Sequence, residues 1–340
     1  MSSSWLVNDL FPAHHKIMDA AIEGSFKTTF GCWLSVMIAS GSSVFGHLVR
    51  QGPVIVADEE TPVEDLERAL DRFSQGVGYQ TYKDLPITVE SLKGFRFGRK
   101  TERDRLIEKI TRIQPVFIRM DSLIAMLPRS SQGRQSLNEN SDAFGETIRD
   151  DLNDILGVSD CSVLLSAHCK KRVAEFTLQE MVKADMITIV RGHGSIVGEG
   201  CDTGIAIYPL SRWPNPTRFV LVFKPRRRPI TADLIYIEMI EQQYGSGPAW
   251  LAEVSPTVLP ASYRAKKLYQ WFSSVSIVSN WQKSAVILKE FSFYNRKECL
   301  EGVLDLVSHE VLYEGKGQAY VLNPNWEKRV SREYADSLKS

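Results

Sequence analysis

The chain has 340 residues, of which 43% are hydrophobic and 24% are charged, and its 41 basic and 41 acidic side chains cancel to a formal net charge of zero. These ordinary globular values exclude a fibrous or wholly disordered class, and a zero net charge means that any contact with nucleic acid must come from local basic patches. The length allows one large α/β domain and a small appended module.

Short apolar runs alternate with amphipathic stretches from Lys16 to about Gln242, which is the pattern of a mostly parallel sheet covered by helices. Two of the runs, PVFIRM and CSVLLSA, are nearly unbroken and therefore typical of central, buried strands. The expected strands are 16–21, 53–58, 115–120, 161–167, 203–209, 218–224 and 233–240, and the first expected helices are 28–39 and 63–73.

Two segments interrupt this alternation. Residues 129–140, RSSQGRQSLNEN, are polar and rich in serine and asparagine, so we expect a mobile loop. Residues 244–262 are rich in glycine and proline and lack a long period, which indicates a domain boundary. The predicted division is a first domain at 1–243, a linker at 244–261 and a C-terminal domain at 262–340.

A phosphate-binding loop is predicted in AIEGSFKTTF, between the first strand and the first helix. Backbone N–H groups and the helix N-terminus attract phosphates, Lys27 adds a positive charge, and the Thr28 hydroxyl can hold Mg²⁺. Ala21 and Phe26 stand where the GxxxxGK[ST] pattern has glycines, so a lysine capping an ordinary turn is the alternative interpretation. The candidate nucleotide-binding residues are Glu23, Gly24, Ser25, Phe26, Lys27, Thr28 and Thr29.

Polar residues follow three of the predicted strands, at the edge where open α/β sheets bind ligands. Glu59 and Glu60 end one strand, and either could polarise an attacking water, although glutamates are also common at helix starts. Asp121 ends the next strand and has the position and type of a Walker B aspartate that holds Mg²⁺. His168 ends a third strand and could sense a γ-phosphate or be structural.

With these motifs, the chain resembles the RecA-like ATPases of the RepA, DnaB and KaiC group, and particularly RepA-type hexameric helicases. The resemblance covers roughly Trp5 to Gln242 and rests on GSFKTT, DEETP, FIRMDSL, SAHCKK and RGHGSIVGEGCD. It implies an α/β fold with a RecA-like P-loop core and a mainly parallel central sheet. It also implies ATP and Mg²⁺ as cofactors, with Glu59 orienting the water and Glu60 in support.

The relatives form rings in which a neighbouring subunit's basic residue reaches the γ-phosphate, and such a group supplies about 10³–10⁵ in rate. The resemblance offers Arg191, or the pair Lys224 and Arg226, for this role, although Arg226 also fits a solvated basic turn. Lys170, Lys171 and Arg172 lie where ring relatives project DNA-binding loops, so they are candidate contacts to single-stranded DNA in a central channel.

The C-terminal segment shows the element order of a small winged-helix domain. Helical periodicity in SYRAKKLYQWFSSV and WQKSAVILKEF is followed by a third helix and a hairpin around EGKGQ. Arg296 and Lys297 on the third helix and Lys316 at the hairpin tip are candidate DNA contacts. Many acidic side chains on the same module leave protein binding open as the alternative.

The remaining signals concern the compartment. The five cysteines show no CxxC pair or metal-ligand spacing, which favours reduced thiols. No signal sequence is visible, and no stretch approaches the roughly 20 apolar residues of a transmembrane helix, so we expect a cytoplasmic protein without a membrane partner.

The sequence therefore predicts a Mg²⁺-dependent ATPase that acts on DNA as a homo-oligomer, a hexameric ring, in replication or mobile-element maintenance. The alternatives are a nucleotide-gated DNA-binding scaffold that seldom hydrolyses ATP, and a regulator whose winged helix recruits a protein.

Overall fold

The computed structural model describes residues 5–22, 26–127, 142–176, 178–192, 194–210, 218–226, 234–243, 246–254 and 263–274, and then 282–283, 287, 303, 306–307, 311–315 and 319–322. Internal contacts divide the chain into two units, residues 1–210 with 217–253 and residues 211–216 with 254–340. The described helices include none that is long and apolar enough to cross a membrane.

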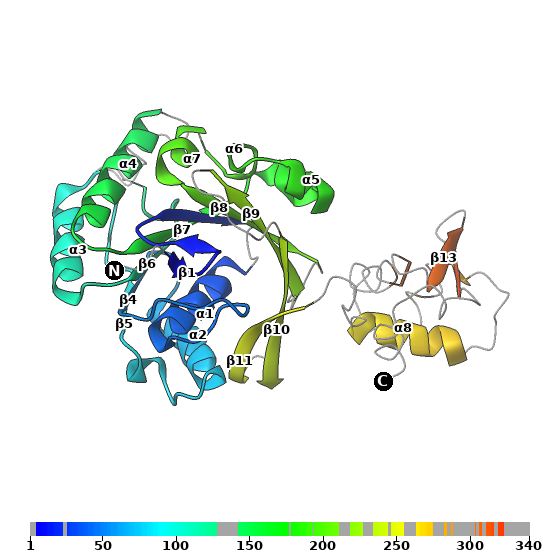
Figure 1. The fold of residues 1–340 in the computed structure, drawn as a ribbon. Helices are drawn as coiled ribbons and strands as arrows, with labels where there is room; N and C mark the ends of the chain where they lie inside the picture. Colours follow the sequence, from blue (N-terminus) through cyan, green and yellow to red (C-terminus); the bar gives the residue numbers. More distant parts are fainter. Residues whose placement is uncertain are drawn as a thin grey trace. The chain divides into compact units, whose positions relative to one another are not determined.

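A sheet of nine strands forms the centre of the first unit (Figure 1). Its strands are β3 (Lys16–Ala21), β4 (Val54–Asp58), β5 (Ile87–Ser91), β6 (Phe117–Asp121), β7 (Ser162–His168), β8 (Thr203–Pro209), β9 (Arg218–Pro225), β10 (Leu234–Gln243) and β11 (Ser246–Glu253). Their order is β11-β10-β9-β8-β3-β7-β6-β4-β5. The stretch from β8 to β5 is parallel, whereas β9, β10 and β11 continue the sheet as an antiparallel meander.

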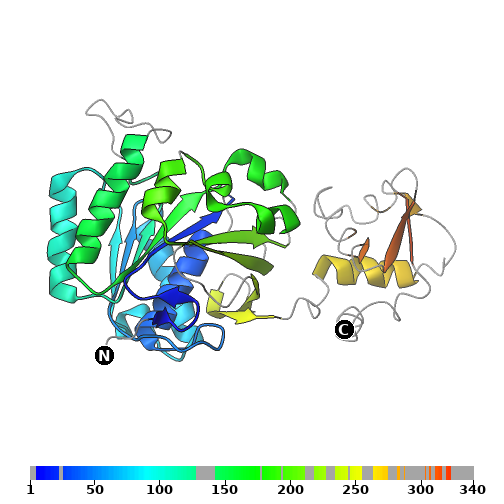
Figure 2. The same cartoon turned by 45° about the horizontal axis from the view of Figure 1, so that its top comes forward.

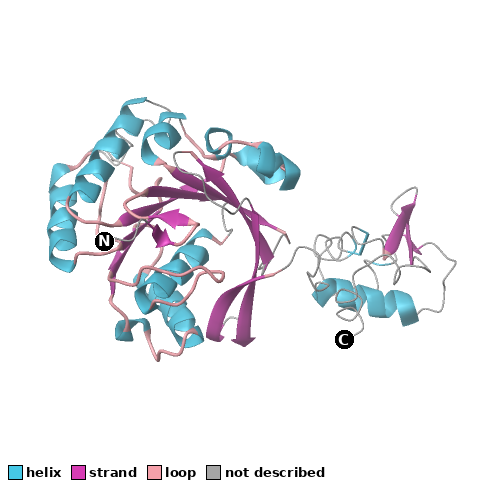
Figure 3. Cartoon of the chain, in the orientation of Figure 1, coloured by secondary structure: helices cyan, strands magenta, loops and turns pink. Residues whose placement is uncertain are grey.

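Helices cover both faces of this sheet (Figures 2 and 3). They are α1 (Lys27–Ser40), α2 (Val63–Gly76), α3 (Lys100–Ile113), α4 (Asp142–Gly157), α5 (Leu178–Lys183), α6 (Met186–Ile189) and α7 (Gly194–Gly200), with short 3₁₀ turns η1 (Tyr82–Asp84) and η2 (Lys171–Glu175). Helices α1 and α2 pack in one hydrophobic cluster, together with the small ladder of β1 (Trp5–Val7) and β2 (Phe11–Pro12), and α3, α4 and α7 pack in another. This is the α/β architecture with a mainly parallel sheet that the sequence predicts.

Successive residues of each strand alternate between the two clusters, as the period of two requires. On β6, Phe117 belongs to the α1 side, Ile118 and Met120 belong to the other, and Arg119 therefore faces α1. By the same alternation, Asp58 on β4 and Asp19 on β3 lie on the side of the sheet that faces α1. Three charged residues thus point toward one buried helix.

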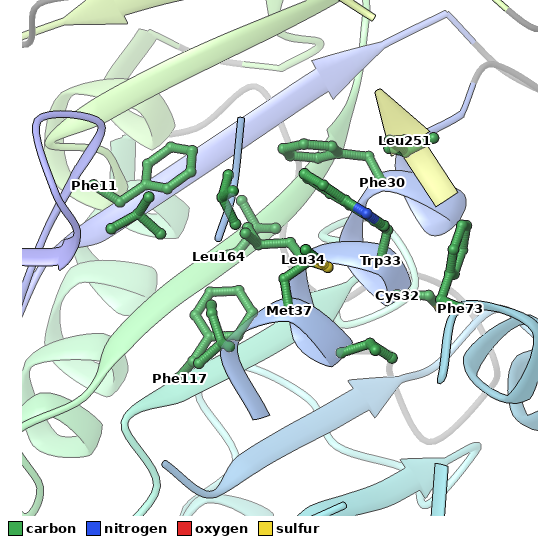
Figure 4. Packing of buried hydrophobic residues seen from close by; sticks show 14 of the residues in the cluster. Phe11, Phe30, Cys32, Trp33, Leu34, Met37, Phe73, Phe117, Leu164 and Leu251 are labelled. Carbon is green, nitrogen blue, oxygen red and sulfur yellow. The ribbon is translucent and has the colours of Figure 1, made fainter. Parts of the chain in front are cut away.

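The antiparallel meander bends back onto helix α2. Arg72 on α2 forms an ion pair with Glu241 on β10 and donates from Nε to the carbonyl of Gly247 at 3.2 Å. Figure 4 shows Leu251 of β11 in the same cluster as Phe73 of α2 and Trp33 of α1. Because β11 occupies 246–253, the predicted linker at 244–261 begins inside the first unit, and the first unit extends ten residues beyond the expected end at 243.

The second unit contains α8 (Tyr263–Ser274) and a small antiparallel sheet of β12 (Gln282–Lys283), β14 (Ala319–Leu322) and β13 (Leu312–Gly315), in that order. The predicted first helix and hairpin are present, and Gln282–Lys283 is a strand where the second helix was expected to start. Leu268, Phe272, Leu306 and Tyr320 belong to its core. Most of the third helix and the candidate DNA contacts Arg296, Lys297 and Lys316 lie outside the described residues, so the winged helix stays a prediction.

Candidate functional site

The predicted phosphate loop lies between β3 and α1, at the carboxyl edge of the parallel strands. Phe26 precedes α1 with φ 61° and ψ −6°, the left-handed region that favours glycine. The backbone therefore takes a glycine-like turn at the position where the motif has a glycine. The ring of Phe26 stacks on Phe219 of β9, with ring centroids 3.5 Å apart and 23° between planes. Glu23, Gly24 and Ser25 lie outside the described residues.

Lys27 and Thr28 open α1 and lie beside the Walker B strand. The Thr28 hydroxyl donates a hydrogen bond of 2.8 Å to the carboxylate of Asp121 at the end of β6. A hydroxyl and one carboxylate suit Mg²⁺, which usually keeps several waters and takes further oxygens from substrate phosphates. Among the described residues there is no cluster of three or more His, Cys, Asp or Glu side chains that could hold a metal ion without oxygens from a substrate. The donor set therefore fits a nucleotide-bound Mg²⁺. Thr29 follows within the first turn of α1 and is half-buried.

A buried arginine that the sequence analysis missed holds two strand ends together. Arg119 is fully buried on β6, donates to Asp58 at 3.1 Å and also contacts the carboxylate of Asp121. Although burial opposes its charge, the carboxylate of Asp121 and its other acidic neighbours hold the pKa of Arg119 above its ordinary value. It lies directly under α1, where a Cβ added to Gly31 would come within 2.2 Å of Arg119 Nε. The only sequence signal was a charged residue inside the apolar run PVFIRM.

Asp19 is a second buried charged residue near this centre. It lies on β3 with no exposed surface, and neither carboxylate oxygen is hydrogen-bonded within the part of the chain that the structure describes. Burial raises the pKa of Asp19 to about 7, and the nearby charge of Asp121 acts in the same direction. The carboxyl group is thus balanced between its neutral and ionised forms near neutral pH.

The two glutamates after β4 have different surroundings. The carboxylate of Glu59 accepts hydrogen bonds of 3.0 Å from the backbone N–H groups of Gly94 and Phe95 and from the guanidinium of Arg96. Glu60 instead lies beside the phosphate loop, with Oε2 3.6 Å from Nε2 of His168. Hydrogen bonding from His168 lowers the pKa of Glu60 to about 2, against the opposing effect of partial burial.

His168 connects Glu60 with the lysine of the phosphate loop. Its other ring nitrogen, Nδ1, lies 3.5 Å from Nζ of Lys27. The histidine ends β7, which pairs in parallel with β3 so that Ala21 is opposite His168. The structure therefore brings together the predicted residues Lys27, Thr28, Asp121, Glu60 and His168 at one edge of the sheet.

The candidate residues for action on a neighbouring subunit lie at opposite edges. Arg191 is exposed and lies at the same edge of the sheet as Lys27 and His168. Its backbone N–H donates to the carbonyl of His168 at 2.8 Å. Lys224 is paired with Gly204, near the start of β3, and its ammonium contacts the carbonyl of Val182.

Arg226 lies at that same far edge, one residue beyond β9. Its guanidinium donates to the carbonyls of Val197, Gly198 and Cys201 at the end of α7, at 2.9 Å in the case of Cys201. Cations are favoured at helix C-termini, where carbonyls lack partners. Within the chain Arg226 is therefore a helix-capping residue remote from Lys27.

The predicted DNA-contacting residues of the first unit directly follow β7. Lys171 and Arg172 are exposed on η2, whereas the ammonium of Lys170 donates to the carbonyl of Ile187 at 2.6 Å. Burial, followed by the charge of Arg172, lowers the pKa of Lys170. Two of the three cations are thus presented to solvent close to the nucleotide edge.

Comparison with known proteins gives a family match and fold likenesses. A family described as "AAA domain" matches residues 2–174. No curated protein matches the chain. The KaiC-like protein PH0186 from the hyperthermophilic archaeon Pyrococcus horikoshii is 13% identical with a TM-score of 0.48, over 74% of this chain and 94% of its own.

A DnaB-like replicative helicase, whose structure describes its interactions with primase, is 12% identical with a TM-score of 0.51. The match covers 71% of this chain and 58% of the helicase, so this chain spans little more than half of that protein's length. At such identity the likeness concerns the fold, and it confirms the expected RecA-like architecture.

Proposed function

Because the chain belongs to the AAA domain family and is a P-loop ATPase with the RecA-like fold of the RepA, DnaB and KaiC group, we propose that it is a Mg²⁺-dependent ATPase that acts on DNA as a ring-forming homo-oligomer. The proposed work on DNA is strand separation or translocation, in replication or in maintenance of a mobile element. Localisation in the cytoplasm is part of the same proposal.

The observation that carries the proposal is the hydrogen bond between Thr28 and Asp121. It joins the first turn of α1 to the end of β6, and it sets the hydroxyl of the residue after Lys27 beside a carboxylate oxygen. A nucleotide held at the start of α1 would have its β- and γ-phosphates near Lys27. Mg²⁺, when bound by Thr28 and Asp121, would neutralise the charge that develops on the transferred phosphoryl group.

The protein's own residues account for the remaining steps. Lys27 would exchange its contact with His168 for a phosphate oxygen, which releases one ring nitrogen of the histidine. A change in the position of His168 on γ-phosphate binding would then reach Glu60 through their contact. It would also reach Lys170, Lys171 and Arg172, which follow His168 in the chain. Arg191 is the better placed candidate for action across a subunit interface, because its backbone N–H donates to the carbonyl of His168, whereas Arg226 lies at the far edge of the sheet.

The DNA part of the proposal is supported by local charge and by fold. Exposed Lys171 and Arg172 lie two and three residues beyond Cys169, at the end of the strand that carries His168, and can contact phosphates. The DnaB-like relative of the same fold is a replicative helicase. We propose single-stranded DNA as the partner and a hexamer as the assembly.

A second candidate function is a nucleotide-gated DNA-binding scaffold with little hydrolysis. Phe26 favours it, because a phenylalanine at φ 61° replaces the glycine that lets a phosphate loop adapt to its ligand. Such a loop would bind nucleotide in one fixed geometry and turn over slowly.

Steady-state ATP hydrolysis with Mg²⁺, with and without single-stranded DNA, separates the two. We expect DNA-stimulated turnover in the wild type and its loss in Lys27→Ala and Asp121→Asn. Lys183→Ala is the matched control, because it removes an ammonium of the same type from α5 rather than from the phosphate loop. ATP binding by the wild type with no turnover above that of Lys27→Ala would establish the scaffold instead.

A further inference from the structure

Glu59 and Glu60 follow β4 directly, and their carboxylates contact different residues. The Glu59 side chain has 3% of its surface exposed and the Glu60 side chain has 49%. Both residues lie in the bend that follows β4, and one of them faces the phosphate loop. The contacts decide which one it is.

The surroundings of Glu59 engage both oxygens of its carboxylate. Its two oxygens accept bonds from two backbone N–H groups, of Gly94 and Phe95, and from the guanidinium of Arg96. A water-orienting carboxylate needs a free lone pair within hydrogen-bond reach of the water. Turning Glu59 toward the phosphate loop would leave the buried N–H of Phe95 and the partly buried donors of Gly94 and Arg96 without their acceptor, which is costly.

Glu59 also connects the nucleotide edge with another part of the unit. The loop that it holds continues to Phe97, whose N–H donates to Met126 at 2.9 Å, and to Gly98, whose N–H donates to Asp151 on α4 at 2.6 Å. The Glu59 N–H itself donates to the carbonyl of Asp121 at 2.6 Å. One residue thus ties together the ends of β4 and β6 and the 92–98 loop.

Glu60 has the opposite character. Its carboxylate is half exposed and lies 3.6 Å from His168, which in turn lies 3.5 Å from the ammonium of Lys27. The turn that presents it is fixed by Asp58, whose Oδ1 accepts hydrogen bonds from the N–H groups of Glu60 at 2.9 Å and Thr61 at 2.6 Å. Glu60 therefore faces the phosphate loop on a constrained backbone.

We propose that the two carboxylates have separate tasks, in which Glu60 is the catalytic residue that orients the attacking water and Glu59 is a positioning residue that anchors the 92–98 loop. The inference rests on the proposed ATPase function and differs from the sequence-based expectation that Glu59 orients the water with Glu60 in support. The water oxygen bonds to the γ-phosphorus as the bond from that phosphorus to the bridging oxygen of ADP breaks. One proton of the water stays on inorganic phosphate, and the other passes along Glu60 to solvent.

The test compares the isosteric variants Glu59→Gln and Glu60→Gln of the full chain in two measurements, ATP turnover and amide hydrogen exchange of peptides covering 92–98. Glu60→Gln should bind ATP, keep wild-type exchange and lose about 10²–10⁴ in kcat. Glu59→Gln should keep kcat within about tenfold, while exchange at Gly94 and Phe95 becomes about tenfold faster, because an amide NH₂ now faces one of their N–H donors.

Arg96→Gln serves as a second variant, because it removes one donor to Glu59 and leaves both carboxylates in place. It should also speed exchange at Phe95 with kcat within about tenfold of the wild type. The proposal is overturned if Glu59→Gln loses as much turnover as Glu60→Gln, or if exchange at Gly94 and Phe95 is unchanged in it. Wild-type turnover no higher than that of Lys27→Ala would instead contradict the ATPase function, and the exchange measurement would still decide the anchoring role of Glu59.

Discussion

The ring of Phe26 stacks on the ring of Phe219, and this contact joins the start of α1 to a strand of the antiparallel meander. Phe26 has a left-handed backbone that costs a non-glycine residue of the order of 1 kcal/mol. An aromatic pair is worth about 0.5–1.5 kcal/mol beyond its area burial, which is enough to offset that strain. The stack therefore stabilises the left-handed turn that a glycine would adopt without support.

The first prediction follows from this contact. Phe219→Ala should raise the Kd for ATP by about three- to tenfold, because the phosphate loop loses the support for its left-handed turn. In a Phe26→Gly background the same substitution should have little effect, since glycine takes that conformation without support. Nucleotide binding by titration calorimetry of the four variants measures the coupling. An equal effect of Phe219→Ala in both backgrounds would contradict the idea.

The second prediction concerns the buried guanidinium. Arg119→Met should lower the free energy of unfolding by about 3–5 kcal/mol, because it leaves the buried carboxylates of Asp58 and Asp121 without their cation. Urea denaturation measures the change. Arg149→Met is the control, because its ion pair with Asp150 is partly exposed and should be worth less than about 1 kcal/mol. A similar small loss in both variants would show that Arg119 is not the centre of the cluster.

The third prediction is a pH dependence. A folded-state pKa of about 7 for Asp19, above the 3.8 of the free group, means that the neutral carboxyl stabilises the fold at acid pH. This contribution is lost as the pH rises from 3.8 toward 7, at up to about 1.4 kcal/mol per pH unit. Asp19→Asn cannot ionise, so its stability relative to the wild type should grow across that window and then level off. Denaturation at several pH values tests this, and a difference that is constant with pH would refute it.

The fourth prediction separates the two arginines. Arg226→Gln should lower the free energy of unfolding by about 1–3 kcal/mol, because the carbonyls at the end of α7 lose a charged donor. Arg191→Gln should cost less stability than Arg226→Gln, because Arg191 is exposed, and it should reduce ATP turnover. Thermal unfolding and turnover are measured on both variants. Loss of turnover without loss of stability in Arg226→Gln would restore its candidacy as the residue that acts on a neighbour.

The sequence was sufficient for the parts of the site that depend on local pattern. The alternation of runs gave the parallel strands, and a polar residue after an apolar run placed Asp121 and His168 at the same edge as Lys27. The sequence could not show which of Glu59 and Glu60 faces the phosphate loop. The direction of Glu59 depends on its contacts with the 92–98 loop, and that loop carries no recognisable motif. Strand β11 was missed because its glycine and proline resemble a linker, whereas its pairing with β10 is a tertiary contact.

The space under Gly31 has a consequence for how the sequence can change. Arg119 cannot move away from a side chain at that position, because two carboxylates hold its guanidinium in a fully buried place. A larger residue at position 31 requires a smaller one at position 119, and the loss of Arg119 in turn removes the partner of Asp58. Positions 31, 58 and 119 should therefore vary together among relatives, so a glycine, an aspartate and an arginine at these places form a signature that identifies chains with the same buried centre.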